Sequence, residues 1–148
     1  MTQKENIKKK NIFLASDHAG FVLKKLIKKF LDKKGIKVLD LGTKNMESVD
    51  YPDYAHLLSK KIKSDKDVGI LICGSGLGMV MSANRHKGIR AALCYNLKST
   101  SLSRLHNNAN VMAIGSRLTK KNTALKCVNK FLSTSFEGGR HLKRIKKI

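Results

Sequence analysis

The sequence predicts an α/β protein with a three-layer, Rossmann-like fold, in which helices cover both faces of a five-stranded parallel sheet. Short apolar runs alternate with longer segments whose apolar residues recur every three or four positions, as in βαβ units. One run, VGILI at 68–72, is apolar without interruption, which is typical of a strand buried on both faces of a parallel sheet. With 148 residues, the chain is expected to form a single domain, 1–148.

Each element follows from its local pattern. Strands are expected at 12–15, 37–41, 68–72, 90–94 and 110–114. Helices are expected at about 21–34, 53–63, 77–86, 99–107 and 120–133. In the first helix an apolar stripe faces the core and lysines 24, 25, 28, 29, 33 and 34 form a solvated face, and Gly35 ends the helix. Asp53 is expected to cap the second helix.

The formal net charge of +21 raises the question of nucleic-acid binding. The lysines are spread along the chain and aromatic residues make up only 5%, so the aromatic interleaving of single-strand binders is missing. We therefore expect weak nonspecific adhesion but no specific nucleic-acid function.

The N-terminal segment and the apolar runs bear on location. Residues 1–10 are polar and basic and are expected to be a flexible extension; they lack the apolar region of a secretory signal. No apolar segment reaches the roughly 18 to 20 residues that span a bilayer, so no membrane association is expected. The cytoplasm is the expected compartment.

Three cysteines without CxxC spacing indicate neither a disulfide framework nor a zinc site. Cys94 and Cys127 lie in apolar segments and are expected to be packed core thiols. Cys73 differs, because it follows the strand at 68–72 and precedes a loop rich in glycine. Ligands bind beyond the carboxyl ends of parallel strands, and glycines there let backbone N–H groups approach an anion.

The loop after Cys73 consists of Gly74, Ser75, Gly76, Leu77 and Gly78. It is not a phosphate-binding Walker A loop, because no Lys-Ser/Thr pair follows it, and its GxGxG spacing is weak evidence for a dinucleotide. A cysteine phosphatase would have arginine where Met79 stands. The parallel fold is expected to bring this loop to the same rim as Asp17 and His18, and we expect the tail to supply Arg140 and Arg144 there. Each of these residues taken singly also has an ordinary structural explanation.

Eight short motifs follow one another along the chain. They are SDHAG (16–20), DYP (50–52), CGSGLG (73–78), ANR (83–85), GIRA (88–91), LSRLHNNANV (102–111), GSR (115–117) and EGGRH (137–141). In this order and spacing the chain resembles ribose-5-phosphate isomerase type B, within the wider family that includes galactose-6-phosphate isomerase subunits. The resemblance implies an aldose–ketose isomerase for phosphorylated sugars that uses no metal and no cofactor.

Moving a carbonyl between C1 and C2 requires a base for a carbon-bound proton, donors for the enediolate and a group that moves hydroxyl protons. The resemblance and this chemistry assign the base to Cys73 and the anion hole to the backbone of 74–78. Ser75 is expected to hydrogen-bond the reacting oxygens, and Asp17 to hold or relay their protons. Some family members place a glutamate base where this chain has Met79, which leaves Cys73 as the expected base.

The resemblance further implies that His106 opens the sugar ring and that Asn107 holds the substrate. It assigns the phosphate to His18, Arg117, Arg140 and Arg144, the last two being four residues apart on one face of a terminal helix. Tyr51 is expected to line the pocket. Family members are homodimers or tetramers, in which the positions of His106, Asn107 and Arg117 complete the site of the neighbouring chain.

Three other interpretations stay open at this point. The first is an isomerase of a six-carbon substrate, galactose 6-phosphate or allose 6-phosphate, since pocket depth does not follow from the sequence. The second is a sugar-phosphate sensor that binds without turnover. The third, a basic nucleic-acid-binding module, predicts an affinity that falls steeply with salt.

Overall fold

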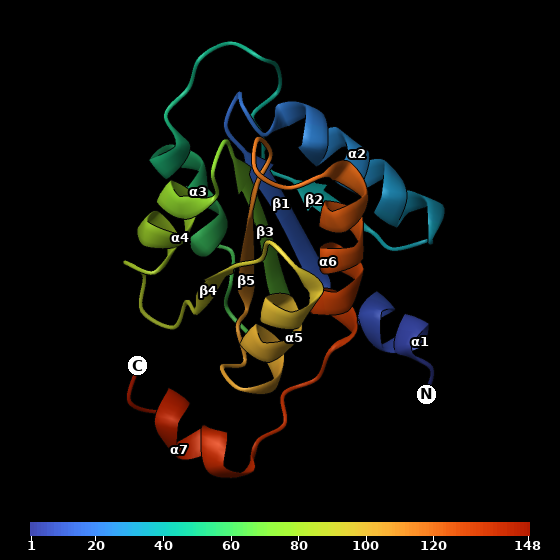
Figure 1. Cartoon of the computed structure of the whole chain (residues 1–148), viewed down its shortest axis with the longest axis vertical. Coiled ribbons are helices and arrows are strands. Elements are labelled where there is room, and N and C mark those ends of the chain that lie inside the picture. The colour runs from blue at the N-terminus through green and yellow to red at the C-terminus, as the bar shows by residue number, and fades with distance from the viewer.

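The computed structural model describes residues 1–148 and contains the predicted five-stranded parallel sheet. Its strand order is β2-β1-β3-β5-β4, with every neighbouring pair parallel (Figure 1). The strands are β1 (Asn11–Ser16), β2 (Val38–Asp40), β3 (Asp67–Cys73), β4 (Ala91–Leu93) and β5 (Val111–Gly115). The predicted fold class is confirmed.

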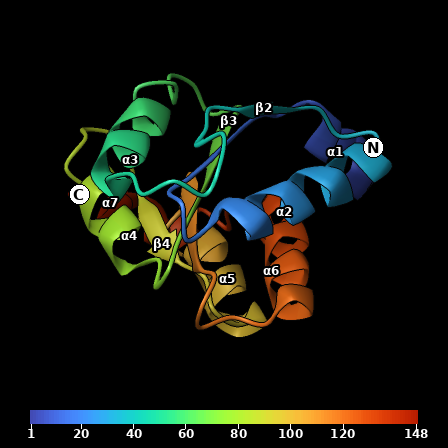
Figure 2. The same cartoon turned by 90° about the horizontal axis from the view of Figure 1, so that it is seen from above.

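Helices cover both faces of the sheet, as Figure 2 shows from above. One layer contains α1 (Gln3–Lys8), α2 (Phe21–Lys33), α5 (Leu97–Leu105) and α6 (Lys121–Ser133). The other contains α3 (Tyr51–Ser59) and α4 (Leu77–Ala83). The chain ends in a 3-10 turn, Gly139–His141, and the short helix α7 (Leu142–Ile145). None of these helices is long and apolar enough to cross a membrane.

The alternation of side chains along β3 fixes which layer each residue meets. Ile70 and Ile72 face the core under α2 and α6, whereas Leu71 and Cys73 face the core under α3 and α4. All seven residues of β3 are buried, which explains why this strand has the clearest sequence signal. Cys94 and Cys127 are also fully buried free thiols, as predicted.

The start of β3 is secured by its first side chain, Asp67. Its carboxylate accepts hydrogen bonds from Asn11 Nδ2 at 2.7 Å and from the backbone N–H groups of Lys63 and Ser64, both at 2.8 Å. Burial alone would raise the pKa of Asp67, but these hydrogen bonds outweigh it and hold the pKa below its usual value.

The N-terminal segment differs from the flexible extension expected over 1–10. Thr2 and Glu5 form a reciprocal capping box, which satisfies backbone donors at the start of α1. Ile7 is only 5% exposed and joins the core beside α6. A single apolar residue within a lysine-rich stretch therefore anchors a helix that the composition did not suggest.

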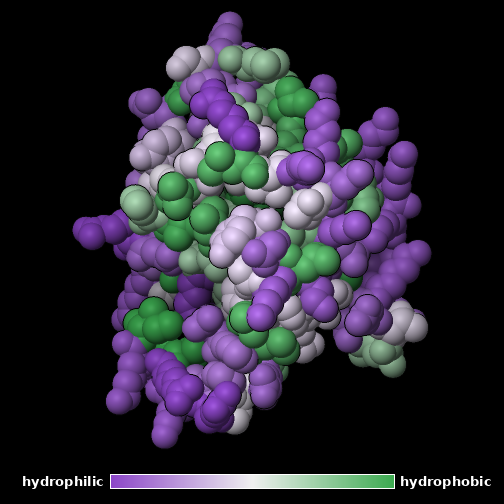
Figure 3. Space-filling view, in the orientation of Figure 1, coloured by the Kyte–Doolittle hydropathy of each residue, from purple (hydrophilic) through white to green (hydrophobic).

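Two smaller expectations are also corrected. Lys24 does not belong to the solvated face of α2, because its side chain is 2% exposed and its Nζ donates to Asp40 at 2.6 Å and to the Thr43 carbonyl at 2.7 Å. The N-cap of α3 is Asp50, and Asp53 lies in the first turn instead. Elsewhere hydrophilic side chains surround the outline of the molecule (Figure 3), in agreement with dispersed lysines.

Candidate active site

Cys73 is the last residue of β3, at the carboxyl end of the central strand of the sheet. Its side chain is 4% exposed, and its Sγ accepts a hydrogen bond from the backbone N–H of Gly76 at 3.1 Å. An N–H group aimed at sulfur favours a negative charge on it, because the donor interacts more strongly with a thiolate than with a thiol. The geometry therefore suits a thiol that must lose its proton.

The loop after Cys73 requires glycine at two close approaches. Gly76 has φ +80°, and a Cβ there would lie 2.6 Å from Leu93 Cδ1. Gly115, at the end of the neighbouring strand β5, lies so close beneath the loop that a Cβ would sit 2.5 Å from the Ser75 carbonyl oxygen. These two glycines let the loop turn over the end of the sheet and place its N–H groups beside the thiol.

A cavity of about 390 Å³ opens at this end of the sheet. It is lined by Asp17, Tyr51, Cys73, Gly74, Ser75, Gly78, Arg117 and Leu118. All but Leu118 were among the residues that the sequence analysis singled out. Leu118 is an exposed aliphatic residue directly after the GSR motif, and no sequence signal marked it.

Local contacts hold three of the polar side chains that line the cavity, those of Asp17, Ser75 and Tyr51. Asp17 is 6% exposed, and its Oδ1 accepts from the Gly20 N–H at 3.0 Å, which fixes the carboxylate after β1. Ser75 Oγ accepts from the Leu77 N–H at 3.3 Å, while the Leu77 side chain itself lies outside the cavity lining. Tyr51, at the start of α3, is held against Gly78, where any Cβ would meet its ring at 2.5 Å.

Two of the residues assigned to phosphate lie at this end. Arg117 is exposed, and its guanidinium lies beside Gly74, where Nη1 would be 3.1 Å from a Cβ. Arg117 lines the same cavity as Cys73 within one chain, so it reaches this cavity without a neighbouring chain, whereas the family resemblance implied that it completes a neighbour's site. His18 follows Asp17, and its Nδ1 accepts from the Val49 N–H at 3.1 Å, so the neutral ring carries its proton on Nε2.

The other assigned residues lie at the opposite end of the sheet. His106 caps α5 and precedes β5, whereas Cys73 pairs with Gly115 at the far end of that strand. At about 3.3 Å per residue, the four steps from Val111 to Gly115 alone separate the two ends by about 13 Å. Asn107 lines a separate cavity of about 300 Å³ beside β4.

The tail also lies away from the Cys73 cavity (Figure 1). Arg140 belongs to the 3-10 turn and Arg144 to the four-residue helix α7, so they do not share one terminal helix as expected. Both side chains are exposed. The expectation of a single rim is therefore wrong within one chain, since the tail packs near the amino ends of the strands.

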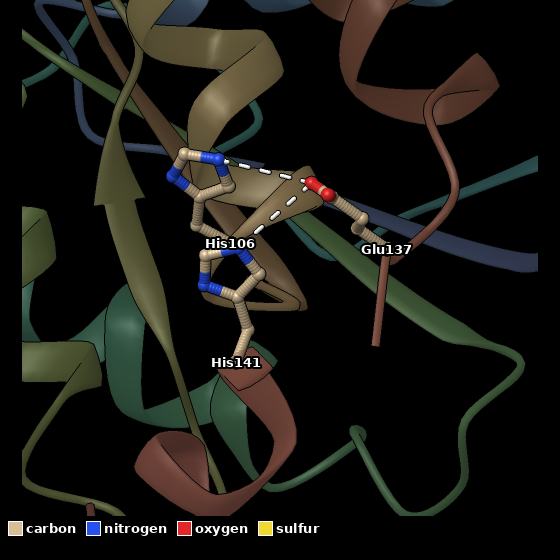
Figure 4. A group of neighbouring side chains, drawn as sticks. All are labelled: His106, Glu137 and His141. Atoms are coloured by element: carbon tan, nitrogen blue, oxygen red, sulfur yellow. Dashed lines mark ion pairs between the residues drawn. The ribbon is translucent and has the colours of Figure 1, made fainter. Parts of the chain in front are cut away.

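Glu137 and His141, to which the sequence analysis assigned no role, lie next to His106 (Figure 4). The Nε2 atoms of His106 and His141 each lie 3.8 Å from Glu137 Oε2, and the two rings stack with their centroids 4.2 Å apart. Burial, together with the neighbouring His106 and Arg140, lowers the pKa of His141. The sequence signal was the four-residue spacing of Glu137 and His141 within the EGGRH motif.

Comparison with known proteins decides the family. Residues 12–148 match the Ribose/Galactose Isomerase family. The chain belongs to this family. The chain is 50% identical over 141 residues to a probable ribose-5-phosphate isomerase B of Mycoplasma genitalium, with 93% of each chain covered. It is 42% identical over 140 residues to ribose-5-phosphate isomerase B of Escherichia coli, with 94% of each covered.

Solved structures of the family show the same architecture. The ribose 5-phosphate isomerase of Thermotoga maritima is 52% identical and superimposes with a TM-score of 0.90, covering 93% of this chain and 95% of that one. The Mycoplasma genitalium ribose-5-phosphate isomerase B was solved with bound ribulose-5-phosphate; it is 49% identical with a TM-score of 0.89, covering 93% and 92%.

Proposed function

We propose that this isomerase interconverts D-ribose 5-phosphate and D-ribulose 5-phosphate, in the non-oxidative pentose phosphate pathway. The observation that carries the proposal is the cavity in which a buried thiol, a buried carboxylate and a loop of backbone N–H groups meet. Relatives that cover more than nine tenths of the chain bear that enzyme's name, and one of them holds ribulose-5-phosphate.

Cys73 is the base for the carbon-bound proton. As a thiolate it takes the proton from C2 of the open-chain aldose, and the electron pair of the C–H bond forms the C1–C2 double bond of the enediolate. The negative charge on oxygen is stabilised by N–H groups of the 74–78 loop other than those of Gly76 and Leu77, which already donate to Cys73 Sγ and Ser75 Oγ. The thiol then returns the proton to C1, which completes the ketose.

The oxygen protons move through polar side chains of the same cavity. Asp17 is held as an acceptor by the Gly20 N–H, and its second oxygen takes the hydroxyl proton from O2 and delivers it to O1. Ser75 hydrogen-bonds the same oxygens, and Tyr51 forms the wall beside Gly78. Arg117 supplies positive charge for the phosphate, and His18, which follows Asp17 in the loop after β1, binds the phosphate as well.

Four of the residues that the family resemblance assigns to ring opening, substrate binding or the phosphate lie outside the Cys73 cavity of their own chain. His106, Asn107, Arg140 and Arg144 lie at the amino ends of the strands, so in one chain they are far from the thiol. We propose a homodimer, or a tetramer built from such dimers, in which these residues of one subunit complete the Cys73 cavity of the other. A twofold arrangement then forms two identical shared sites.

Complementation tests the shared site. Cys73→Ser and His106→Asn are co-expressed in equal amounts, and ribose 5-phosphate turnover is compared with that of each variant alone. In a mixed dimer one site collects both substitutions and the other collects none, and random pairing makes about half of the dimers mixed. Activity should recover to roughly a quarter of that of the unsubstituted enzyme. No recovery, with mixed dimers shown by affinity tags, would refute sharing.

A direct assay tests the activity itself. The purified protein is incubated with ribose 5-phosphate without added metal, and ribulose 5-phosphate is measured over time. Allose 6-phosphate and galactose 6-phosphate are assayed in parallel, and the highest kcat/KM should be for the five-carbon pair. A preference for a six-carbon substrate would move the assignment within the family, and binding without turnover would indicate a sensor. We place the enzyme in the cytoplasm, where phosphorylated sugars are kept.

A further inference from the structure

His18 is held by a segment to which the sequence analysis assigned no role, the loop 41–50 between β2 and α3. Its Nδ1 accepts a hydrogen bond from the backbone N–H of Val49 at 3.1 Å. In Figure 1 this loop arches from the β2 side of the sheet to α3, over the end at which the strands finish. Two segments that are 31 residues apart in the sequence therefore meet next to Asp17, which lines the cavity.

The contact permits only one place for the proton of the neutral ring. A backbone N–H group can only donate, so Nδ1 must offer its lone pair and the proton lies on Nε2. A proton on Nδ1 would set two N–H groups against each other. His18 Nε2 has no hydrogen-bond partner within the chain, and this atom of the half-buried ring remains accessible. The ring thus presents a free donor to a ligand.

The loop that supplies this N–H is fixed at its start by a buried lysine. Lys24 is 2% exposed, and its Nζ donates to Asp40 at 2.6 Å and to the Thr43 carbonyl at 2.7 Å. Asp40 also accepts from the Gly42 N–H at 2.9 Å. A buried ammonium is tolerated only where such acceptors surround it, so α2 and the start of the loop are held together.

Both ends of the loop are also tied to the site. The Ser16 N–H donates to the Gly42 carbonyl at 2.8 Å, and the Thr43 N–H donates to the Ser16 carbonyl at 2.9 Å. At its other end the loop leads into α3, whose first residue, Tyr51, packs against Gly78. His18 follows Ser16 by two residues and therefore meets a loop whose position is set at both ends.

We propose that Val49 is a positioning residue, whose N–H holds His18 as the one tautomer that donates from Nε2 to the phosphate of the substrate. This inference rests on the proposed function for the assignment of the phosphate to His18. Phosphate oxygens are acceptors, and a hydrogen bond to a charged group is worth about tenfold to a hundredfold in affinity. The other tautomer would turn a lone pair toward the phosphate and repel it.

Nitrogen NMR reads the tautomer directly and requires no activity. The enzyme is labelled with nitrogen-15 in histidine and studied at about pH 9, where an imidazole with the ordinary pKa of about 6.5 is neutral. Correlations between the carbon-bound ring protons and the two nitrogens show which nitrogen carries the proton. His18→Gln identifies the signal of His18 among the five histidines. The unsubstituted enzyme should show only the Nε2–H form of His18.

Val49→Pro removes the donor, and Ser48→Pro is the matched control. Proline has no N–H, and both substitutions stiffen the same loop, but the Ser48 N–H makes no hydrogen bond within the chain. In Val49→Pro the Nδ1–H form of His18 should appear, at about the fraction found in free histidine under the same conditions. In Ser48→Pro this form should stay undetectable, and kcat and KM should remain within about twofold.

Replacing the ring separates the roles of its two nitrogens. The amide nitrogen of Gln can occupy the place of Nε2, and that of Asn the place of Nδ1, so only His18→Gln keeps a donor for the phosphate. The dissociation constant of inorganic phosphate, measured by phosphorus NMR, should rise about tenfold in His18→Asn and less than about threefold in His18→Gln. The KM for ribose 5-phosphate should follow the same order.

The outcomes are distinguishable. An Nδ1–H form of His18 in the unsubstituted enzyme, or its equal appearance in both proline variants, would overturn the inference, and so would tighter phosphate binding by His18→Asn than by His18→Gln. If the tautomer behaves as expected but both His18 variants bind phosphate like the unsubstituted enzyme, the assignment of the phosphate to His18 is wrong. If the enzyme holds this tautomer and binds phosphate but does not turn over ribose 5-phosphate, the proposed function fails while the role of Val49 stands.

Discussion

Cys73→Ser tests the assignment of the base with little disturbance of the fold. Serine replaces sulfur by oxygen in a side chain that accepts a hydrogen bond from the Gly76 N–H, and a hydroxyl oxygen accepts that hydrogen bond as well. The free energy of unfolding should therefore fall by only about 1 kcal/mol. Chemical denaturation, followed by circular dichroism, measures this change before any activity is compared.

The effect on turnover should be far larger than the effect on stability. A positioned general base contributes a factor of about 10² to 10⁴, and a serine hydroxyl does not ionise at neutral pH. We expect kcat to fall by about 10³, while KM stays within about threefold because Asp17 and Arg117 still line the cavity. The assay follows the formation of ribulose 5-phosphate from ribose 5-phosphate.

Cys94→Ser is the matched control. Cys94 is fully buried away from the cavity, and burial raises the pKa of its thiol to about 11. Only about one Cys94 in 10³ to 10⁴ is then ionised between pH 7 and 8. This variant should lose stability but keep kcat within about twofold. Iodoacetamide should likewise modify Cys73 in the native enzyme, with ribose 5-phosphate protecting it, and leave Cys94 unmodified.

The reasoning would be refuted by a folded Cys73→Ser enzyme that retains kcat within about tenfold of the unsubstituted protein. Equal losses in the two serine variants would also contradict it, because Cys94 has no access to substrate. Inactivation by iodoacetamide without modification of Cys73 would show that the reactive nucleophile is another residue.

Three further predictions concern the scaffold. Gly115→Ala should displace the loop after β3, lowering kcat and costing about 1 to 3 kcal/mol of unfolding free energy, and a crystal structure with an unmoved loop would contradict this. Asp40→Ala leaves the ammonium of Lys24 buried, so it should cost about 2 kcal/mol, and adding Lys24→Met should restore part of it in denaturation experiments. The pKa of Asp67 is lower in the folded than in the unfolded chain, so the ionised carboxylate adds to the free energy of unfolding above about pH 4, and this stabilisation is lost as the pH falls further. Between about pH 5 and pH 2, the free energy of unfolding of Asp67→Asn should therefore fall less than that of the unsubstituted protein.

The central strands and their loops were predictable because local sequence decides them. An uninterrupted apolar run is compatible with only a buried strand or a buried helix, and the glycines after Cys73 end the run at a fixed point. Parallel pairing then brings the loops after β1, β3 and β5 together, whatever the rest of the chain does. The cavity formed by Asp17, Cys73 and Arg117 is a consequence of that topology.

Features that depend on a distant partner were not predictable. Lys24 has the spacing of a solvated lysine and is buried only because Asp40 and the Thr43 carbonyl, sixteen and nineteen residues away, satisfy its ammonium. Helix α1 is held by the packing of Ile7 beside α6, and its composition alone indicates a flexible segment. The resemblance to a family assigned a ring-opening role to His106, but only the three-dimensional structure shows at which end of the sheet this residue lies.

The position of His106 has a consequence for the activity of the whole molecule. One chain carries the carbon base at the carboxyl ends of the strands and the proposed ring-opening acid at the amino ends, separated by the length of β5. Neither the Cys73 end nor the His106 end of the sheet is sufficient for a substrate that is mostly cyclic. The thiolate acts only on the open aldehyde, and the acid acts only on the ring. In the proposed dimer, association creates two complete sites from two incomplete surfaces. Assembly would then be part of catalysis. A separated subunit folded around the same core would still hold Cys73 and Asp17 in place. Its turnover of ribose 5-phosphate would nevertheless depend on the slow, spontaneous opening of the sugar ring.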